Sequence, residues 1–168
     1  MSRSLEITVL SGESLRVDRK PVKKNAYVIV RTESNNVVMT RMDTEGRNYP
    51  SWNEKMVVDM SVHERFITFE VECKTTMGIR RVGMARIPVS DFVGGYLPDN
   101  YLHFLSYRLR DFEGNRNGII NFSVRVTAAT SEVLSCSATA ARVGTTVGEM
   151  KNGGNDSGVV TGVPVWWN

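Results

Sequence analysis

The residues with the clearest chemical potential lie between Leu15 and Val30, in the stretch LRVDRKPVKKNAYVIV. This stretch contains one acid, Asp18, and a group of four cations: Arg19, Lys20, Lys23 and Lys24. An aspartate can supply oxygen to Ca²⁺, which takes six to eight oxygen ligands. Clustered cations instead attract phosphate and other anions. Because the cations outnumber the acid, the stretch favours anion binding, and the alternative is an ordinary solvated basic loop.

Short runs of alternating apolar and polar residues predict eight strands, with almost no helical period. The fifth run is the clearest, because Ile67, Phe69 and Val71 alternate with polar residues. One short helical turn is expected from Ser90. The predicted strands are 5–9, 26–32, 37–41, 55–60, 67–72, 82–89, 105–110 and 120–126. Short strands at regular spacing predict an all-β, eight-stranded antiparallel sandwich.

From about Ala129 the composition shifts to Ser, Thr, Gly and small residues without a sustained period. Such a segment buries too little apolar surface to offset its ordering entropy. We therefore predict one domain over residues 1–128 and a flexible tail over 129–168 that ends in the apolar segment VPVWW. The alternative for this end is a short anchor that adds to a sheet edge or inserts at a surface. Its partner-binding candidates are Val163, Val165, Trp166 and Trp167.

The net charge of +3 suits an anionic partner, either membrane or nucleic acid. The basic loop has no aromatic residue to stack on bases, which disfavours nucleic acid. No apolar run approaches the roughly 20 residues that cross a bilayer, so any membrane contact is predicted to be peripheral. The two cysteines, Cys73 and Cys136, show neither a disulfide framework nor a metal-binding spacing. The strand pattern begins within four residues of the start, which leaves no room for a secretory signal. Together with the lack of a disulfide framework, this predicts a cytoplasmic protein.

Catalysis is not expected from the sequence. His63 and His103 lie far apart, neither accompanies a nucleophile, and no Gly-rich phosphate loop is present. Arg31, Arg41 and Lys55 form a second candidate basic patch on a sheet face. We therefore predict a binding protein with no enzymatic activity and no small-molecule substrate.

Four landmarks in the sequence resemble those of the C2 domain, a small β-sandwich that docks on phospholipid. In order, they are the opening Leu15–Asp18–Tyr27, then Thr40 with YPSWNE at 49–54, VGMARIPV at 82–89 and the closing GIINFSVRV at 118–126. The match covers about residues 4–128. Starting directly with the strand at Leu5 is similar to the circularly shifted variant common among plant members. The resemblance implies a C2-type sandwich. Separately, we expect Tyr27 and Trp52 to be core aromatic residues.

The resemblance also implies where calcium ligands would lie. The family's first loop supplies two aspartates, whose positions fall near Asp18 and on Asn25. Its third loop supplies three more, which fall on Cys73, Thr75 and Arg80. One carboxylate of five remains, so we predict no cofactor, with Ca²⁺ at low affinity as the alternative. The residual metal candidates are Asp18, Asn25 and Asp43.

In place of calcium, the same loops offer cations and apolar side chains to an anionic membrane. Each cation near an anionic leaflet contributes about 1 kcal/mol, and each fully buried apolar side chain about 1.5–3 kcal/mol. The sum describes weak docking that needs a second attachment. The predicted lipid-binding residues are Arg19, Lys20, Lys23, Lys24, Met77, Ile79, Arg80 and Arg81.

Four segments further resemble the bonzai-associated proteins, a group of small plant C2 proteins. They are RSLEITVLSGESLRVDRKP, DFVGG, HFLSYRLRD and VVTGVPVW. Members of that group are partners of copines and dampen programmed cell death and defence responses. The resemblance implies a cytoplasmic adaptor, peripheral at the plasma membrane, that binds anionic phospholipid and a copine-type protein. Two alternatives stay open: a calcium-dependent phospholipid sensor, and a protein-interaction module without lipid contact.

Overall fold

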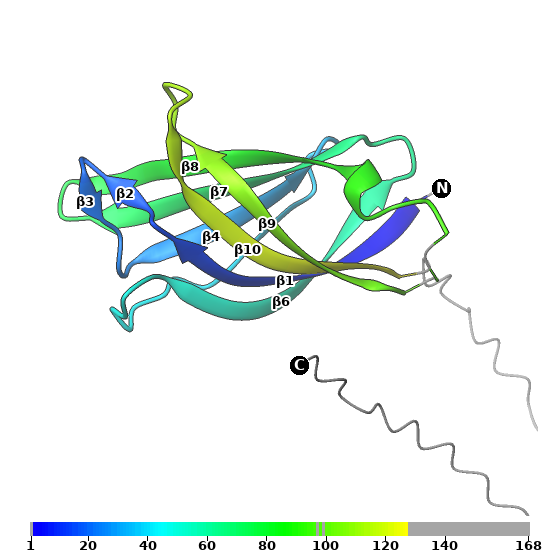
Figure 1. Ribbon diagram of the computed structural model, residues 1–168, viewed down its shortest axis with the longest axis horizontal. Helices are drawn as coiled ribbons and strands as arrows, with labels where there is room; N and C mark the ends of the chain where they lie inside the picture. The colour runs from blue at the N-terminus through cyan, green and yellow to red at the C-terminus, as the bar shows by residue number, and fades with distance from the viewer. Residues whose placement is uncertain (1, 97, 99, 128–168) are drawn as a thin grey trace, which may run out of the picture. The chain divides into compact units, whose positions relative to one another are not determined.

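Strands make up most of the chain that the computed structural model describes, which is residues 2–96, 98 and 100–127 (Figure 1). The strands are β1 (Ser2–Glu13), β2 (Arg16–Val17), β3 (Lys20–Pro21), β4 (Ala26–Thr32), β5 (Val37–Met39), β6 (Ser51–Ser61), β7 (Phe66–Thr75), β8 (Gly78–Pro88), β9 (Leu102–Arg110) and β10 (Arg116–Thr127). A single-turn 3₁₀ helix, η1 (Val89–Asp91), follows β8.

The eight longer strands form two antiparallel layers. One layer has the order β5-β4-β7-β8 and the other the order β9-β10-β1-β6. The layers are joined by one backbone pair, Met84 with Arg110. The last strand, β10, lies between β9 and the first strand, β1, with Leu5 opposite Val126. The first and last strands are therefore neighbours, as the expected circular shift requires.

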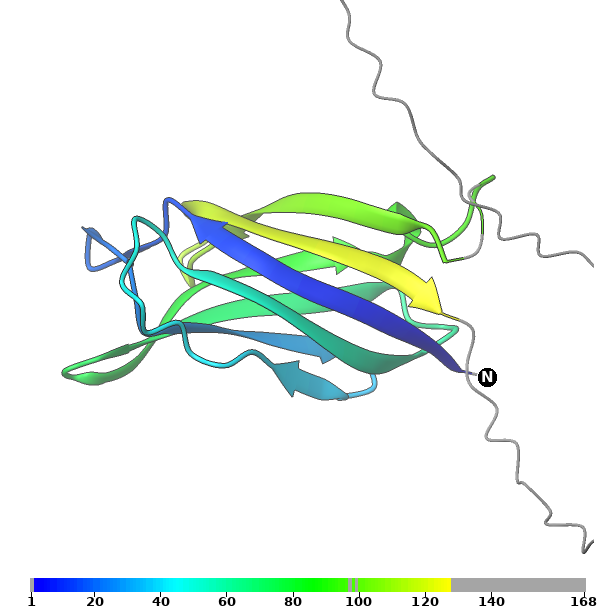
Figure 2. The same cartoon turned by 90° about the horizontal axis from the view of Figure 1, so that it is seen from below.

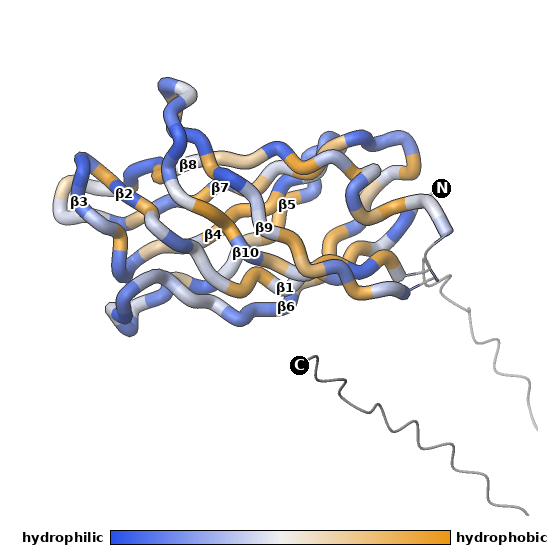
Figure 3. Tube along the Cα trace, in the orientation of Figure 1, coloured by the Kyte–Doolittle hydropathy of each residue, from blue (hydrophilic) through white to orange (hydrophobic). Residues whose placement is uncertain are grey.

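Alternation along each strand turns one set of side chains into the space between the layers. At its centre, Phe69 of β7 and Phe122 of β10 stack with ring centroids 4.3 Å apart. Both rings are fully buried, and burial of a side chain of this size contributes about 1.5–3 kcal/mol. Figure 3 shows the hydrophobic positions along the strands and mostly hydrophilic positions in the connections. The core therefore holds the two layers together and leaves the connections free for binding.

The eight predicted strands are confirmed as β1 and β4 to β10. The third is shorter than predicted, because β5 ends at Met39 and residues 40 and 41 belong to the following loop. The helical turn expected from Ser90 is present as η1. The β2–β3 hairpin was not predicted, since two-residue strands are too short to show alternation.

Of the two aromatic residues expected in the core, only Trp52 packs against it. The expectation for Tyr27 was wrong. Its neighbours Ala26 and Val28 point into the core, so alternation turns Tyr27 to the outer face of β4. There its hydroxyl donates a hydrogen bond to Glu72, which raises the pKa of Tyr27 to about 12.

The two ends of the sandwich carry different connections, as Figures 1 and 2 show. The β2–β3 hairpin, the loop 40–50 and the β7–β8 turn lie together at one end, which we call the loop end. The opposite end is fastened by Glu64, which is buried. Its carboxylate accepts hydrogen bonds from the backbone N–H groups of Ser61 (3.1 Å) and Glu33 (3.0 Å). These bonds tie the β4–β5 connection to the β6–β7 connection at the end away from the hairpin.

Candidate functional site

The connection between β1 and β4 is built as a small hairpin. β2 and β3 pair with Val17 opposite Lys20, which leaves Asp18 and Arg19 as a two-residue turn. Both turn residues have positive φ, 50° and 66°. Positive φ at both central positions is the requirement of a type I′ hairpin turn. The hairpin therefore exposes Asp18 and Arg19 at its tip.

A pocket of about 430 Å³ lies between this hairpin and the β7–β8 turn. One wall carries Asp18, Lys20, Lys23 and Lys24. The other wall carries Thr75, Thr76, Met77 and Arg80. The lining also includes Val22 and Cys73, both buried. We call this site the cationic pocket, because four of its side chains are cations and one is an acid.

The cations of the pocket differ from those of the second candidate basic patch. Within residues 2–96, 98 and 100–127, none of the four forms an ion pair. By contrast, all three members of the second candidate basic patch are paired: Arg31 with Glu70 at 3.8 Å, Arg41 with Glu54 at 3.6 Å, and Lys55 with Glu6 at 3.1 Å. The pocket therefore offers an anion unpaired positive charge that the second candidate basic patch does not.

Arg80 and Arg81 are neighbours in sequence but lie on opposite faces of β8. Arg80 is opposite Cys73 in the β7–β8 register and lines the pocket. Arg81 is opposite Glu72, and its guanidinium forms an ion pair with Glu70 on the outer face. Of these two neighbouring arginines, only Arg80 therefore joins the lysines of the hairpin.

Two apolar side chains project at the tip of the β7–β8 turn. Met77 is 83% exposed and Ile79 is 62% exposed. Between them Gly78 has a φ of 113°, a conformation that favours glycine. The Thr75 hydroxyl donates a hydrogen bond to the Gly78 carbonyl at 2.8 Å, which fixes the turn. The turn therefore holds two large apolar groups in water beside the cationic pocket.

The residual metal candidates come from the hairpin turn, the segment before β4 and the loop 40–50. Both carboxylate oxygens of Asp43 already accept backbone hydrogen bonds, from Glu45 and Ser51, each at 3.0 Å. The backbone N–H of Asn25 donates a hydrogen bond to the backbone carbonyl of Asp43, whereas Asp18 lies at the hairpin tip. In the part of the chain that the structure describes, no group of three or more His, Cys, Asp or Glu side chains is placed to hold a metal ion.

Sequence reasoning missed the residue that anchors the hairpin, Asn117. Its side-chain oxygen accepts the Arg16 N–H at 3.0 Å. Its amide nitrogen donates to the carbonyls of Arg16 at 2.8 Å and Val82 at 2.6 Å. One amide thus ties β2 to β8, the strand that carries Arg80. The Asn-Gly pair at 117–118 was a turn signal, but its partners are about 35 and 100 residues away in sequence.

Burial shapes the chemistry of Cys73 at the pocket wall. Its thiol lies near the carbonyl oxygen of Lys24, at 3.6 Å. Burial raises the pKa of the Cys73 thiol, which keeps it protonated near neutral pH. The predictions made for residues 129–168, which include Cys136 and the candidates Val163, Val165, Trp166 and Trp167, concern residues outside the described part of the chain.

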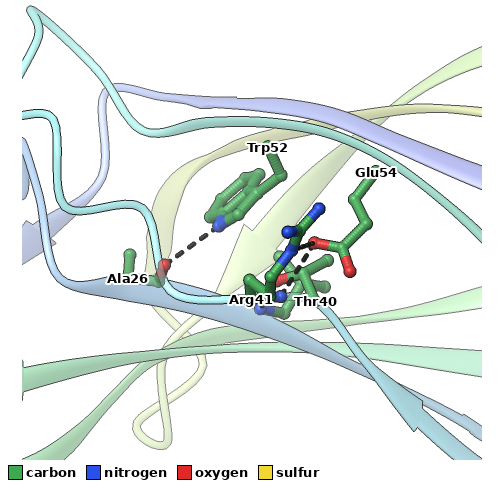
Figure 4. Close-up of polar contacts among 6 residues, drawn as sticks. Ala26, Thr40, Arg41, Trp52 and Glu54 are labelled. Carbon is green, nitrogen blue, oxygen red and sulfur yellow. Dashed lines mark hydrogen bonds and ion pairs between the residues drawn. The ribbon is translucent and has the colours of Figure 1, made fainter.

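The motif around Thr40 and Trp52 ties the middle loop to β4 (Figure 4). The Trp52 indole N–H donates to the Ala26 carbonyl at 2.9 Å, across from one layer to the other. The Thr40 hydroxyl accepts the Val28 N–H at 3.0 Å. Glu54 accepts the backbone N–H of Arg41 at 2.8 Å. These bonds fix the start of β4, and hence the end of the hairpin loop that carries Lys23 and Lys24.

Comparison with known proteins decides the family. Residues 3–104 match the model of the C2 domain. The chain belongs to the C2 domain family. It is 40% identical to BON1-associated protein 2 of Arabidopsis thaliana over an alignment of 194 residues, which covers 98% of this chain and 93% of that protein.

Solved C2 structures show the same fold. A C2 domain of plant Extended Synaptotagmin 1 has a TM-score of 0.62 at 15% identity, over 76% of this chain and 96% of that one. Human GIVD cytosolic phospholipase A2 has a TM-score of 0.60 at 13% identity, over 77% of this chain and 17% of that one. At these identities the likeness establishes the fold alone. Among the residues described, this C2 domain has no helix long and apolar enough to span a bilayer.

In this C2 domain, the first and third loops meet at the cationic pocket. Three of the positions where the family resemblance implied carboxylates, namely Cys73, Thr75 and Arg80, line it. A thiol, a hydroxyl and a guanidinium therefore occupy places suited to calcium ligands. With four cations and one acid in its lining, the pocket has a net positive charge that favours anions.

Proposed function

We propose that this C2 domain is a non-enzymatic, peripheral membrane adaptor that docks on anionic phospholipid through the cationic pocket, without requiring Ca²⁺. The observation that supports this most directly is the set of four cations that line the pocket without ion pairs in the described residues. Anionic headgroups supply the countercharge that the protein does not. The single acid, Asp18, reduces this attraction but does not cancel it.

The strength of this docking follows from the charges. At about 1 kcal/mol per cation, four cations contribute about 4 kcal/mol, which corresponds to a dissociation constant near 1 mM. Insertion of Met77 or Ile79, both exposed at the tip, adds about 1.5–3 kcal/mol for each side chain that is fully buried. Such docking is reversible and weakens with salt. Stable residence at the membrane therefore needs a second attachment.

We propose that a copine-type protein supplies this second attachment at the plasma membrane, and that the adaptor restrains cell death and defence responses. The support is the relative named BON1-associated protein 2, which matches 98% of this chain. Two weak contacts on one surface reinforce each other, because the second binds at high effective concentration. Purified copine should raise the fraction of this protein on anionic vesicles by more than tenfold. An unchanged fraction would count against a copine partner. The cellular role is tested by expressing this protein in Arabidopsis that lacks BON1-associated protein 2, where it should restore normal cell death. Failure to do so would count against that role.

Vesicle co-sedimentation across a salt series tests the lipid contact. The expected result is binding to phosphatidylserine vesicles but not to neutral vesicles, unchanged by chelator and fading as salt rises. Binding that disappears with chelator would instead establish a calcium sensor. Failure to bind under any of these conditions would leave a protein-interaction module without lipid contact. Circular dichroism of the same samples shows that the β-sandwich is intact in each case.

A further inference from the structure

The cations of the pocket come from two different elements. Lys20, Lys23 and Lys24 belong to the hairpin loop, whereas Arg80 belongs to β8. The pocket lies between these elements, so an anion inside it is approached from both sides. Arg80 adds a planar guanidinium, which binds two oxygens of one phosphate, and the lysines add point charges. This arrangement suits several phosphate oxygens in one ligand better than a single charge.

The chemistry of the headgroup follows from the charge count. A phosphatidylserine headgroup carries about one net negative charge, while each phosphomonoester carries about −1.5 to −2 at neutral pH. We infer that the pocket takes the multiply phosphorylated headgroup of a phosphoinositide in the bilayer. This inference rests on the lipid docking proposed above and names the ligand of that same site. The Thr76 hydroxyl, which also lines the pocket, adds a neutral donor for a phosphate oxygen.

The outer face of β4, β7 and β8 also carries several arginines, but these are paired with carboxylates. Arg31 and Arg81 both pair with Glu70, which is buried, and Arg86 pairs with Glu33 at 3.2 Å. A phosphate on that face would have to displace a carboxylate from each arginine. In the pocket no such displacement is needed. Among the described residues, the pocket therefore offers a phosphoinositide unpaired cations that the outer face does not.

The source of the phosphates is the membrane because apolar groups flank the pocket. Met77 lines the pocket and is 83% exposed, and Ile79 beside it is 62% exposed. A soluble anion gains nothing from these side chains, whereas a bilayer buries them while the headgroup occupies the pocket. The same tip therefore combines a phosphate site with an insertion site.

The test compares vesicles with equal total negative charge, supplied by phosphatidylserine or by phosphatidylinositol bisphosphate, in the presence of chelator. Each further cation that a headgroup contacts tightens the dissociation constant about fivefold. A bisphosphate that contacts two more cations should bind about 25-fold more tightly. Arg80→Gln should remove about fivefold of this preference. Arg108→Gln, which removes an exposed cation on β9 outside the pocket lining, is the matched control and should leave the preference unchanged.

The outcomes separate the inference from the proposal on which it rests. Equal binding to both vesicle types overturns the inference and leaves the anionic-lipid proposal standing, whereas binding to neither overturns both. Ile79→Ser, which changes an exposed side chain outside the pocket lining, should weaken vesicle binding but leave calorimetric binding of soluble inositol trisphosphate unchanged. Unweakened vesicle binding by that variant would refute the assignment to a membrane-held headgroup. Circular dichroism confirms that each variant is folded.

Discussion

Asp18→Asn changes the charge of the cationic pocket without disturbing the turn that carries it. Asp18 is the acid among the described residues that line the pocket, opposite four cations. Its φ is 50°, and asparagine adopts positive φ at least as readily as aspartate. The substitution therefore preserves the type I′ hairpin and removes one negative charge.

The size and sign of the effect follow from the proposed mode of binding. One unit of charge near an anionic leaflet is worth about 1 kcal/mol, which is about fivefold in the dissociation constant. Asp18→Asn should therefore bind phosphatidylserine vesicles about fivefold more tightly in chelator and low salt. The same change in a calcium site would remove a ligand carboxylate and weaken binding. The two modes thus predict opposite signs from one measurement.

Asp59→Asn provides the matched control for this measurement. Asp59 lies on β6, where its carboxylate accepts a hydrogen bond from the Ser4 hydroxyl at 2.6 Å, and an asparagine oxygen can still accept it. The control removes the same charge outside the pocket lining, so it should change vesicle affinity less than twofold. If Asp18→Asn binds no more tightly than wild type in chelator, or if both variants gain equally, the pocket is not the lipid site.

Three further predictions concern the scaffold. Asn117→Ala should lower the free energy of unfolding by about 1–3 kcal/mol, measured in urea, because it removes the hydrogen bonds that tie β2 to β8. Glu64→Ala should cost about 1–3 kcal/mol for the same reason while vesicle affinity stays unchanged, since it lies at the far end; a matching loss of affinity would contradict the separation of the two ends. Because the hydrogen bond to Glu72 raises the pKa of Tyr27 to about 12, its stabilisation is complete below about pH 10 and is lost as pH rises towards 12. In a pH titration, phenolate absorbance should show a step near pH 12 that Tyr27→Phe abolishes.

The sequence alone was sufficient for the eight longer strands. Residues 67–72 and 120–126 alternate with period two, and they form the centres of β7 and β10. Alternation is a local property, because successive side chains of a strand point to opposite faces whatever the strand packs against. The β2–β3 hairpin escaped prediction because each strand has two residues. The outward orientation of Tyr27 was not predicted either. Its aromatic character favours the core, and only the register of β4 places it on the outer face.

The charge of the loop could be read directly from Lys20, Lys23 and Lys24, and so could the shortage of carboxylates for calcium. What the tertiary structure alone decided is which cations act together. Arg80 and Arg81 are indistinguishable in sequence, yet one lines the pocket and the other is paired with Glu70. The physical reason is that a strand separates adjacent residues onto opposite faces, while the fold brings loops far apart in sequence to one end.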